Sequence, residues 1–200
     1  MQVVTDAPPR GARRAGFMES ERMTVLELPP SARLGAIARS IERAMRTGQR
    51  GEVEGAARAF LSAAAEFYQV PKCEIRVLAA RPLRVRENWT SELFGDYQRE
   101  TRLVRVWMKT AVRKEITSFG TFLSTLCHEF CHHLDCARFG FHDSWHTRGF
   151  YERAAALYHH ARGTPAKRIF WAPASRGRWR IDWPRTNRGS SGDSKGRRGG

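Results

Sequence analysis

The sequence predicts a single α+β domain, and three observations lead to this fold class. The chain has 200 residues, of which 41% are hydrophobic and 28% charged, an ordinary composition for one globular domain with flanking segments. Apolar residues recur at helical spacing over 31–69 and again over 118–161. Between these regions, residues 74–108 contain short segments rich in β-branched and aromatic side chains, which are typical of strands.

The N-terminal part predicts two helices after an irregular leader. Residues 1–28 are rich in Pro, Gly and Arg without a sustained hydrophobic period, so we expect a flexible leader. Apolar residues at three- and four-residue spacing predict a helix from Ser31 to the region of Gly48. A second helix is predicted from Glu52 to Gln69, and Pro71 ends it.

The middle of the chain predicts a small, mostly antiparallel sheet. Three short strands are expected over 74–79, 83–87 and 103–108, and Gly95-Asp96-Tyr97 forms a turn or a strand lead-in. The strand at 103–108 is apolar at most positions, which indicates burial on both sides. We expect this strand to offer an edge to which an extended peptide pairs.

Two further helices follow, and the first of them contains the motif that indicates a metal site. One is predicted over 118–139 with Ser118 as its N-cap, and the other over 149–161. A loop over 140–147 joins them. Gly163 and the following proline end the second of these helices.

The C-terminal segment carries most of the positive charge. The formal net charge is +15, and the last forty residues hold 11 basic and 2 acidic side chains. Residues 167–183, with aromatic and basic residues interleaved, are expected to form a two-stranded ribbon, followed by a disordered basic tail over 184–200. The pattern suits binding of nucleic acid through stacking and cationic contacts. A ribbon whose rings pack on the domain while its arginines face water explains the same pattern, and we favour this interpretation for the aromatic residues.

Composition also excludes some classes of protein. No stretch approaches the roughly 18–20 apolar residues of a membrane span, so we expect no membrane partner. The four cysteines form no disulfide framework, which favours a reduced, cytoplasmic compartment. We read Cys127, Cys131 and Cys136 as small buried side chains.

The strongest functional signal is the segment His128-Glu129-Phe130-Cys131-His132, an HExxH motif. Residues four apart lie on one face of a helix, so His128 and His132 can bind one metal ion, with Glu129 close enough to act on water. The third ligand stays open among three candidates in the following segment. They are His142, His146 and Glu152.

Two neighbours of the motif have two interpretations each. His133 is one step around the helix from His132, which favours packing or a surface position over metal binding. Asp135 suits either a hydrogen bond from a ligand imidazole or an ordinary helix-end contact.

Together with His146-Thr147-Arg148-Gly149-Phe150, the HExxH segment resembles the SprT-like metallopeptidase domain, the family that includes Spartan. The similarity spans about 95–160 within a domain that we place at 29–183. It implies a zincin-like fold, a Zn²⁺ ion held by His128, His132 and His146, and Glu129 as the catalytic acid and base. The chain departs from the family pattern at Thr147, where glycine is usual, and it has no C-terminal zinc-ribbon cysteines.

The resemblance implies a zinc-dependent metallopeptidase that cleaves peptide bonds with a zinc-bound water activated by Glu129. Its substrates would be proteins or peptides, among them proteins associated with nucleic acid. The alternative is a zinc-stabilised nucleic-acid-binding module without peptidase activity. Four residues are candidates for stabilising the oxyanion of the reaction: His142, Arg148, Tyr151 and Tyr158.

Overall fold

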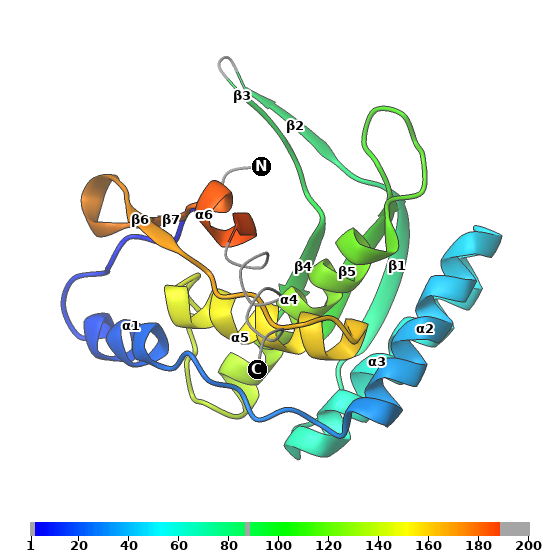
Figure 1. The fold of residues 1–200 in the computed structure, drawn as a ribbon, viewed down its shortest axis with the longest axis horizontal. Helices are drawn as coiled ribbons and strands as arrows, with labels where there is room; N and C mark the ends of the chain where they lie inside the picture. Colours follow the sequence, from blue (N-terminus) through cyan, green and yellow to red (C-terminus); the bar gives the residue numbers. More distant parts are fainter. Residues whose placement is uncertain (1–2, 87–88, 189–200) are drawn as a thin grey trace, which may run out of the picture.

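Six helices and seven short strands make up the part of the chain that the computed structural model describes, residues 3–86 and 89–188 (Figure 1). The predicted α+β single domain is confirmed. The helices are α1 (Arg13–Arg22), α2 (Ser31–Thr47), α3 (Arg50–Tyr68), α4 (Phe119–Ala137), α5 (Arg148–Arg162) and α6 (Trp183–Arg188). The strands are β1 (Glu74–Ala80), β2 (Leu83–Arg86), β3 (Trp89–Glu92), β4 (Gly95–Gln98), β5 (Leu103–Lys109), β6 (Trp171–Pro173) and β7 (Trp179–Ile181).

The main sheet is mixed, which corrects the mostly antiparallel sheet predicted from the sequence. Its order is β1-β5-β4, with β5 parallel to β1 and antiparallel to β4. After β1 the chain makes the β2–β3 arm, which Figure 1 shows extending away from the helices. The chain then continues as β4, reverses its direction and forms β5 between β4 and β1. Strand β5 is therefore the central strand, and the edges of the sheet are β1 and β4 instead of the expected strand at 103–108.

One apolar core joins the sheet to helices α2, α3, α4 and α5. The residues that predicted the helices lie in it: Leu34 and Ile41 of α2 and Phe60 of α3 are almost fully buried. Burial of such side chains stabilises each by about 1.5–3 kcal/mol. Because both neighbouring strands and helices pack on α4, this helix is held on several sides.

The helix ends follow the predicted capping. The Ser118 side chain accepts a hydrogen bond from the backbone N–H of Thr121, so Ser118 is the N-cap of α4. Gly163 has a left-handed conformation at the C-terminus of α5. None of the described helices is long and apolar enough to span a bilayer.

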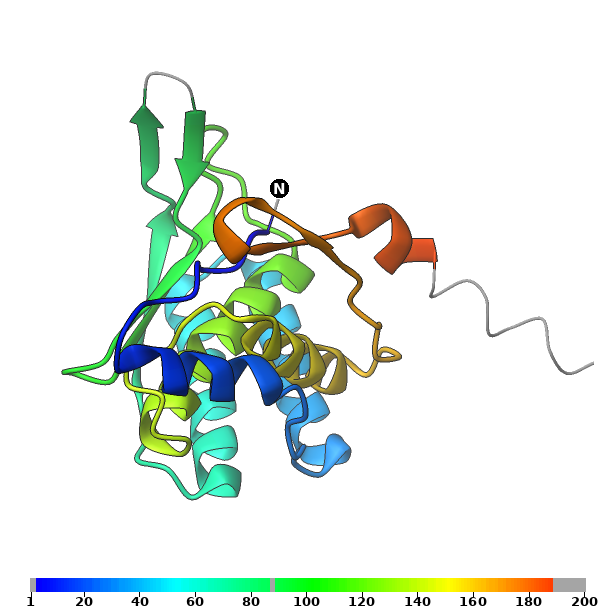
Figure 2. The same ribbon diagram turned by 90° about the vertical axis from the view of Figure 1, so that its left-hand side faces the viewer.

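The leader differs from the prediction. Residues 13–22 form α1, whose Phe17 and Ser20 are buried, and α1 packs on α5 (Figure 2). Residues before it pair with the C-terminal ribbon, where Val4 forms a bridge with Arg180. The sequence did not predict α1 because its buried positions are few and one of them is polar.

The C-terminal ribbon is confirmed in a shorter form, as antiparallel strands β6 and β7. The tail predicted to be disordered from residue 184 begins instead with α6, in which Thr186 is buried. The rest of the tail, 189–200, lies outside the described residues.

Candidate metal centre

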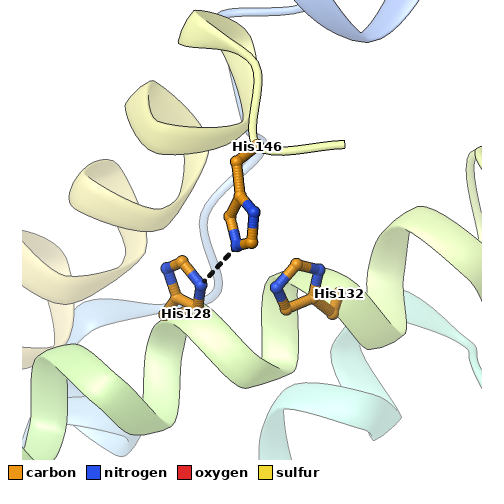
Figure 3. A group of neighbouring side chains, drawn as sticks. All are labelled: His128, His132 and His146. Carbon is orange, nitrogen blue, oxygen red and sulfur yellow. Dashed lines mark hydrogen bonds between the residues drawn. The ribbon is translucent and has the colours of Figure 1, made fainter. Parts of the chain in front are cut away.

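Helix α4 and the start of α5 bring three histidines together. His128 and His132 lie on one face of α4, and His146 reaches them from the loop before α5 (Figure 3). One ring nitrogen of each lies within 4.8 Å of the others, an arrangement that could hold a metal ion. The His128 and His146 Nε2 atoms are 3.0 Å apart.

The outer nitrogen of His132 is fixed by a chain of hydrogen bonds. Its Nδ1 lies 2.7 Å from Ser144 Oγ, and that hydroxyl donates to Asp135 Oδ2 at 3.0 Å. The hydroxyl proton therefore faces Asp135, and Ser144 Oγ accepts from the His132 Nδ1–H. This leaves the Nε2 lone pair of His132 directed inward, as a metal ligand requires.

Asp135 acts on the ligand through Ser144 rather than by the direct contact considered from the sequence. Its other oxygen accepts from Arg153 at 2.7 Å, and both side chains are almost completely buried. Burial raises the pKa of Asp135 to about 6 despite this arginine. The pair ties α4 to α5 through a residue three positions after His132.

His146 is held from the N-terminal segment. Its backbone N–H donates to Asp6 Oδ2 at 2.8 Å, and its Nδ1 lies 3.4 Å from the same oxygen. The hydrogen bond from His146 lowers the pKa of Asp6. Sequence reasoning missed Asp6 because it lies in a segment without periodicity, far from the motif in sequence.

Electrostatics keep the imidazoles of α4 neutral. Burial, followed by the charge of nearby His146, lowers the pKa of His128 to about 3. Burial also lowers the pKa of His132 well below its ordinary value. At neutral pH both rings are therefore uncharged, and each has one nitrogen lone pair to offer, which is the form that binds metal.

The side chain of Glu129, on α4, lies against the edge strand β4. This side chain is buried, and burial, followed by the charge of Asp96, raises its pKa to about 8. Strand β4 is so close that a Cβ on Gly95 would lie 2.9 Å from Glu129 Oε1 and 2.6 Å from Thr125 Cγ2. Only glycine fits at this position without moving these neighbours.

The other candidate third ligands lie apart from the histidine cluster. Glu152 accepts a hydrogen bond from the Trp171 indole at 3.0 Å, so its carboxylate holds the ribbon on α5. His142 is exposed, and its backbone oxygen accepts from Arg99. Neither residue belongs to the group of potential ligands found among the described residues.

Aromatic rings surround the cluster. Phe150 is fully buried, with its ring centre 4.5 Å from that of His132 and 4.8 Å from that of His128. Tyr151 stacks on His146 at 5.7 Å. Of the four candidates for oxyanion stabilisation, Tyr151 is the one whose ring lies against the cluster.

The remaining oxyanion candidates have other partners. Arg148 pairs with Glu21 and covers the Trp179 ring at 4.2 Å. The hydroxyl of Tyr158 contacts Arg162 near the other end of α5. The contacts of Arg148 therefore hold α5 against α1 and β7, whereas the contact of Tyr158 lies within α5.

Other residues near the motif serve the fold. His133 is buried, with Nδ1 2.9 Å from the Tyr97 hydroxyl and Nε2 2.8 Å from the Pro71 carbonyl oxygen. This confirms the packing interpretation. Cys127 and Cys131 are buried in the core, as expected, and burial raises the pKa of both thiols. Cys136, which was also expected to be buried, is only partly buried.

The rings of the C-terminal ribbon take part in intramolecular contacts. Phe170 lies beneath Arg185 at 4.3 Å and Arg168 at 5.0 Å. The Trp171 indole bonds to α5, and Trp179 is covered by an arginine. These contacts favour the packing interpretation for the aromatic residues, while the exposed arginines remain open to solvent.

A comparison of the chain with protein-family models, curated proteins and solved structures finds no match.

Proposed function

We propose that this chain is a zinc-dependent metallopeptidase of the SprT-like type. His128, His132 and His146 bind the ion, and Glu129 is the general base and acid. The observation that carries the proposal is the convergence of three imidazoles, two of which (His132 and His146) already have a partner at the outer ring nitrogen. Glu129, the residue after His128 on the same helix, adds a buried carboxyl.

The donor set fits zinc. Tetrahedral zinc has Zn–N distances of about 2.0–2.1 Å, which place ligand nitrogens about 3.4 Å apart. The His128 and His146 Nε2 atoms, at 3.0 Å, need to separate only slightly. Three protein ligands leave a fourth position open, as in catalytic rather than structural zinc sites.

The residues divide the reaction among them. Zinc, when bound, supplies Lewis-acid polarisation of the peptide carbonyl and activation of water. Glu129 takes the proton of the attacking water and returns it to the leaving amine. The positive charge of the ion favours the ionised carboxylate and so offsets the burial that raises the pKa of Glu129. Tyr151 donates from its hydroxyl to the developing oxyanion.

Strand β4 is the edge on which we place the substrate. It pairs with β5 on one side, at the position where Gly95 lies against Glu129. An extended peptide that pairs with the other side of β4 would bring its backbone next to this carboxyl. This replaces the edge at 103–108 expected from the sequence, because β5 lies in the middle of the sheet.

The test combines metal content with peptidase activity on a denatured protein substrate. We expect the wild-type chain to bind about one zinc ion and to cleave the substrate. Glu129→Gln should retain zinc and lose activity by about 100-fold or more, and His146→Ala should lose both. Glu152→Gln is the matched control, because its amide oxygen still accepts from Trp171. Full activity in Glu129→Gln, or no zinc uptake by the wild type, would refute the proposal.

A zinc-stabilised nucleic-acid-binding module is the second candidate, favoured by exposed basic side chains on the ribbon. Arg168, Arg176 and Arg180 are exposed there, and such groups bind phosphates with a marked salt dependence. The metal and peptidase assays, together with a measurement of DNA binding, separate the two functions. Zinc uptake and salt-sensitive DNA binding, with no peptidase activity in any preparation, would favour the module.

A further inference from the structure

The N-terminal segment pairs with β7 of the C-terminal ribbon at an antiparallel bridge between Val4 and Arg180. The Thr5 N–H donates to the Trp179 carbonyl oxygen at 2.8 Å, and the Ile181 N–H donates to the Val3 carbonyl oxygen at 3.1 Å. The Trp179 N–H in turn donates to Thr5 Oγ1 at 2.9 Å. Thr5 is buried. This pairing fixes the direction of the chain and places the next residue, Asp6, beside His146.

Asp6 binds both the backbone and the ring of His146. The two residues exchange backbone contacts, since the Asp6 N–H donates to the His146 carbonyl oxygen at 3.0 Å while Asp6 Oδ2 accepts the His146 N–H at 2.8 Å. The same carboxylate oxygen lies 3.4 Å from His146 Nδ1. The opposite ring nitrogen, Nε2, points to His128. The ring therefore stands between a carboxylate and the histidine cluster.

Helix α1 supports the same residue from its other side. Its Ser20 hydroxyl lies 2.9 Å from that of Thr147, the N-cap of α5. A Cβ on Gly149 would lie 2.1 Å from the Ser20 carbonyl oxygen, so α1 and α5 touch through their backbones. Arg153 donates to the carbonyl oxygens of Ser20 and Met23. The N-terminal segment thus holds His146 itself, through Asp6, and the residues that follow it, through α1.

We propose that the N-terminal segment is part of the metal centre and that Asp6 is a positioning residue that orients His146 toward the ion. The inference rests on the zinc site of the proposed function. A carboxylate on the outer nitrogen of a ligand imidazole fixes its tautomer and raises its basicity, and loss of such a partner typically lowers metal affinity by 10–100-fold.

The groups that contact the outer ring nitrogens of His132 and His146 come from different parts of the chain. His132 is oriented by Asp135 and Ser144, which follow it in the chain by three and 12 residues. His146 is oriented by a residue that only the paired N-terminal strand brings near. An event that displaces residues 3–6 would therefore weaken zinc binding and leave the helices of the core in place.

The experiment measures zinc affinity of the full chain by chelator competition. We expect Asp6→Ala to lower the affinity by about 10–100-fold. Asp6→Asn should cause a smaller loss, because its amide oxygen still accepts the His146 N–H without the negative charge. Asp143→Asn, an exposed carboxylate on the same loop, is the matched control and should bind zinc as the wild type does.

A spectroscopic readout separates orientation from general destabilisation. In ¹⁵N spectra of the zinc-loaded protein, Asp6→Asn should shift the Nδ1 signal of His146 and leave that of His132 unchanged. Unfolding of the metal-free variants should show that the fold is retained. Wild-type zinc affinity in both Asp6 variants would overturn the inference while the proposed zinc site stands. Failure of the wild type and of Asp143→Asn to bind zinc would overturn both.

Discussion

Glu129→Gln should change how the stability of the metal-free protein depends on pH. The carboxyl has an ordinary pKa of 4.5, and in the folded protein burial and then Asp96 raise it to about 8. Between these two values the folded state keeps a proton that the unfolded state releases. The contribution of this carboxyl to the stability of the wild type is therefore complete below about pH 4.5 and is lost progressively as the pH rises through about 8. Glutamine does not titrate.

The magnitude follows from the shift. Each pKa unit corresponds to about 1.4 kcal/mol. Taking the two pKa values as 4.5 and about 8, the free energy of unfolding of Glu129→Gln should gain about 3–4 kcal/mol on that of the wild type between pH 5 and pH 8. Other buried groups titrate in both proteins, so their contributions cancel in the difference.

Urea unfolding in the presence of a chelator, repeated at several pH values, measures this difference. Glu115→Gln, at an exposed position, controls for the loss of one negative charge. Adding zinc should reduce the difference, because the ion favours the ionised carboxylate. We expect the difference in free energy of unfolding between the wild type and Glu129→Gln to change from pH 5 to pH 8. A constant difference would refute the inference that this carboxyl is buried and neutral.

Three further outcomes are expected. Gly95→Ala should lower peptidase activity and keep zinc, because the methyl group would displace Glu129; unchanged turnover would show that β4 adapts freely. Removal of zinc should lower the melting temperature by about 5–10 °C relative to protein at 100 times the dissociation constant, and identical scans would speak against the site. Arg153→Met should cost about 3 kcal/mol or more in urea unfolding, since it leaves Asp135 buried without its partner; a loss below about 1 kcal/mol would contradict this.

The sequence predicted the parts of the fold that have a strong local signal. Helices α2 to α5 carry apolar residues at helical spacing along most of their length, and that periodicity results from burial in one core. His128 and His132 were predicted as a pair because their spacing alone places them on one helical face. For the third member of the cluster, spacing left His142, His146 and Glu152 open.

What the sequence could not provide depends on contacts between distant segments. Helix α1 is held by backbone and polar contacts of Ser20 and Arg153, which leave no hydrophobic period. Asp6 lies near the cluster only because residues 3–5 pair with β7. The insertion of β5 between β1 and β4 is a matter of topology, and the strands' composition does not encode it.

The electrostatics of strand β4 lead to a last prediction about the pH dependence of catalysis. Asp96 accepts two hydrogen bonds from Arg105, at 2.7 and 2.5 Å, which fix its carboxylate on the edge strand. From there its negative charge helps to raise the pKa of Glu129. Asp96→Asn removes this charge and leaves the arginine unneutralised, and both changes favour the ionised form of Glu129.

The acidic limb of the profile of kcat/KM against pH should therefore move to lower pH in Asp96→Asn, since the base is ionised over a wider range. Asp143→Asn, away from β4, controls for the loss of charge. A limb that stays in place would mean that burial alone sets the pKa of the base. A limb that moves to higher pH would mean that the Asp96–Arg105 pair acts on Glu129 by holding β4 in position, because loss of that support would bury the carboxyl differently.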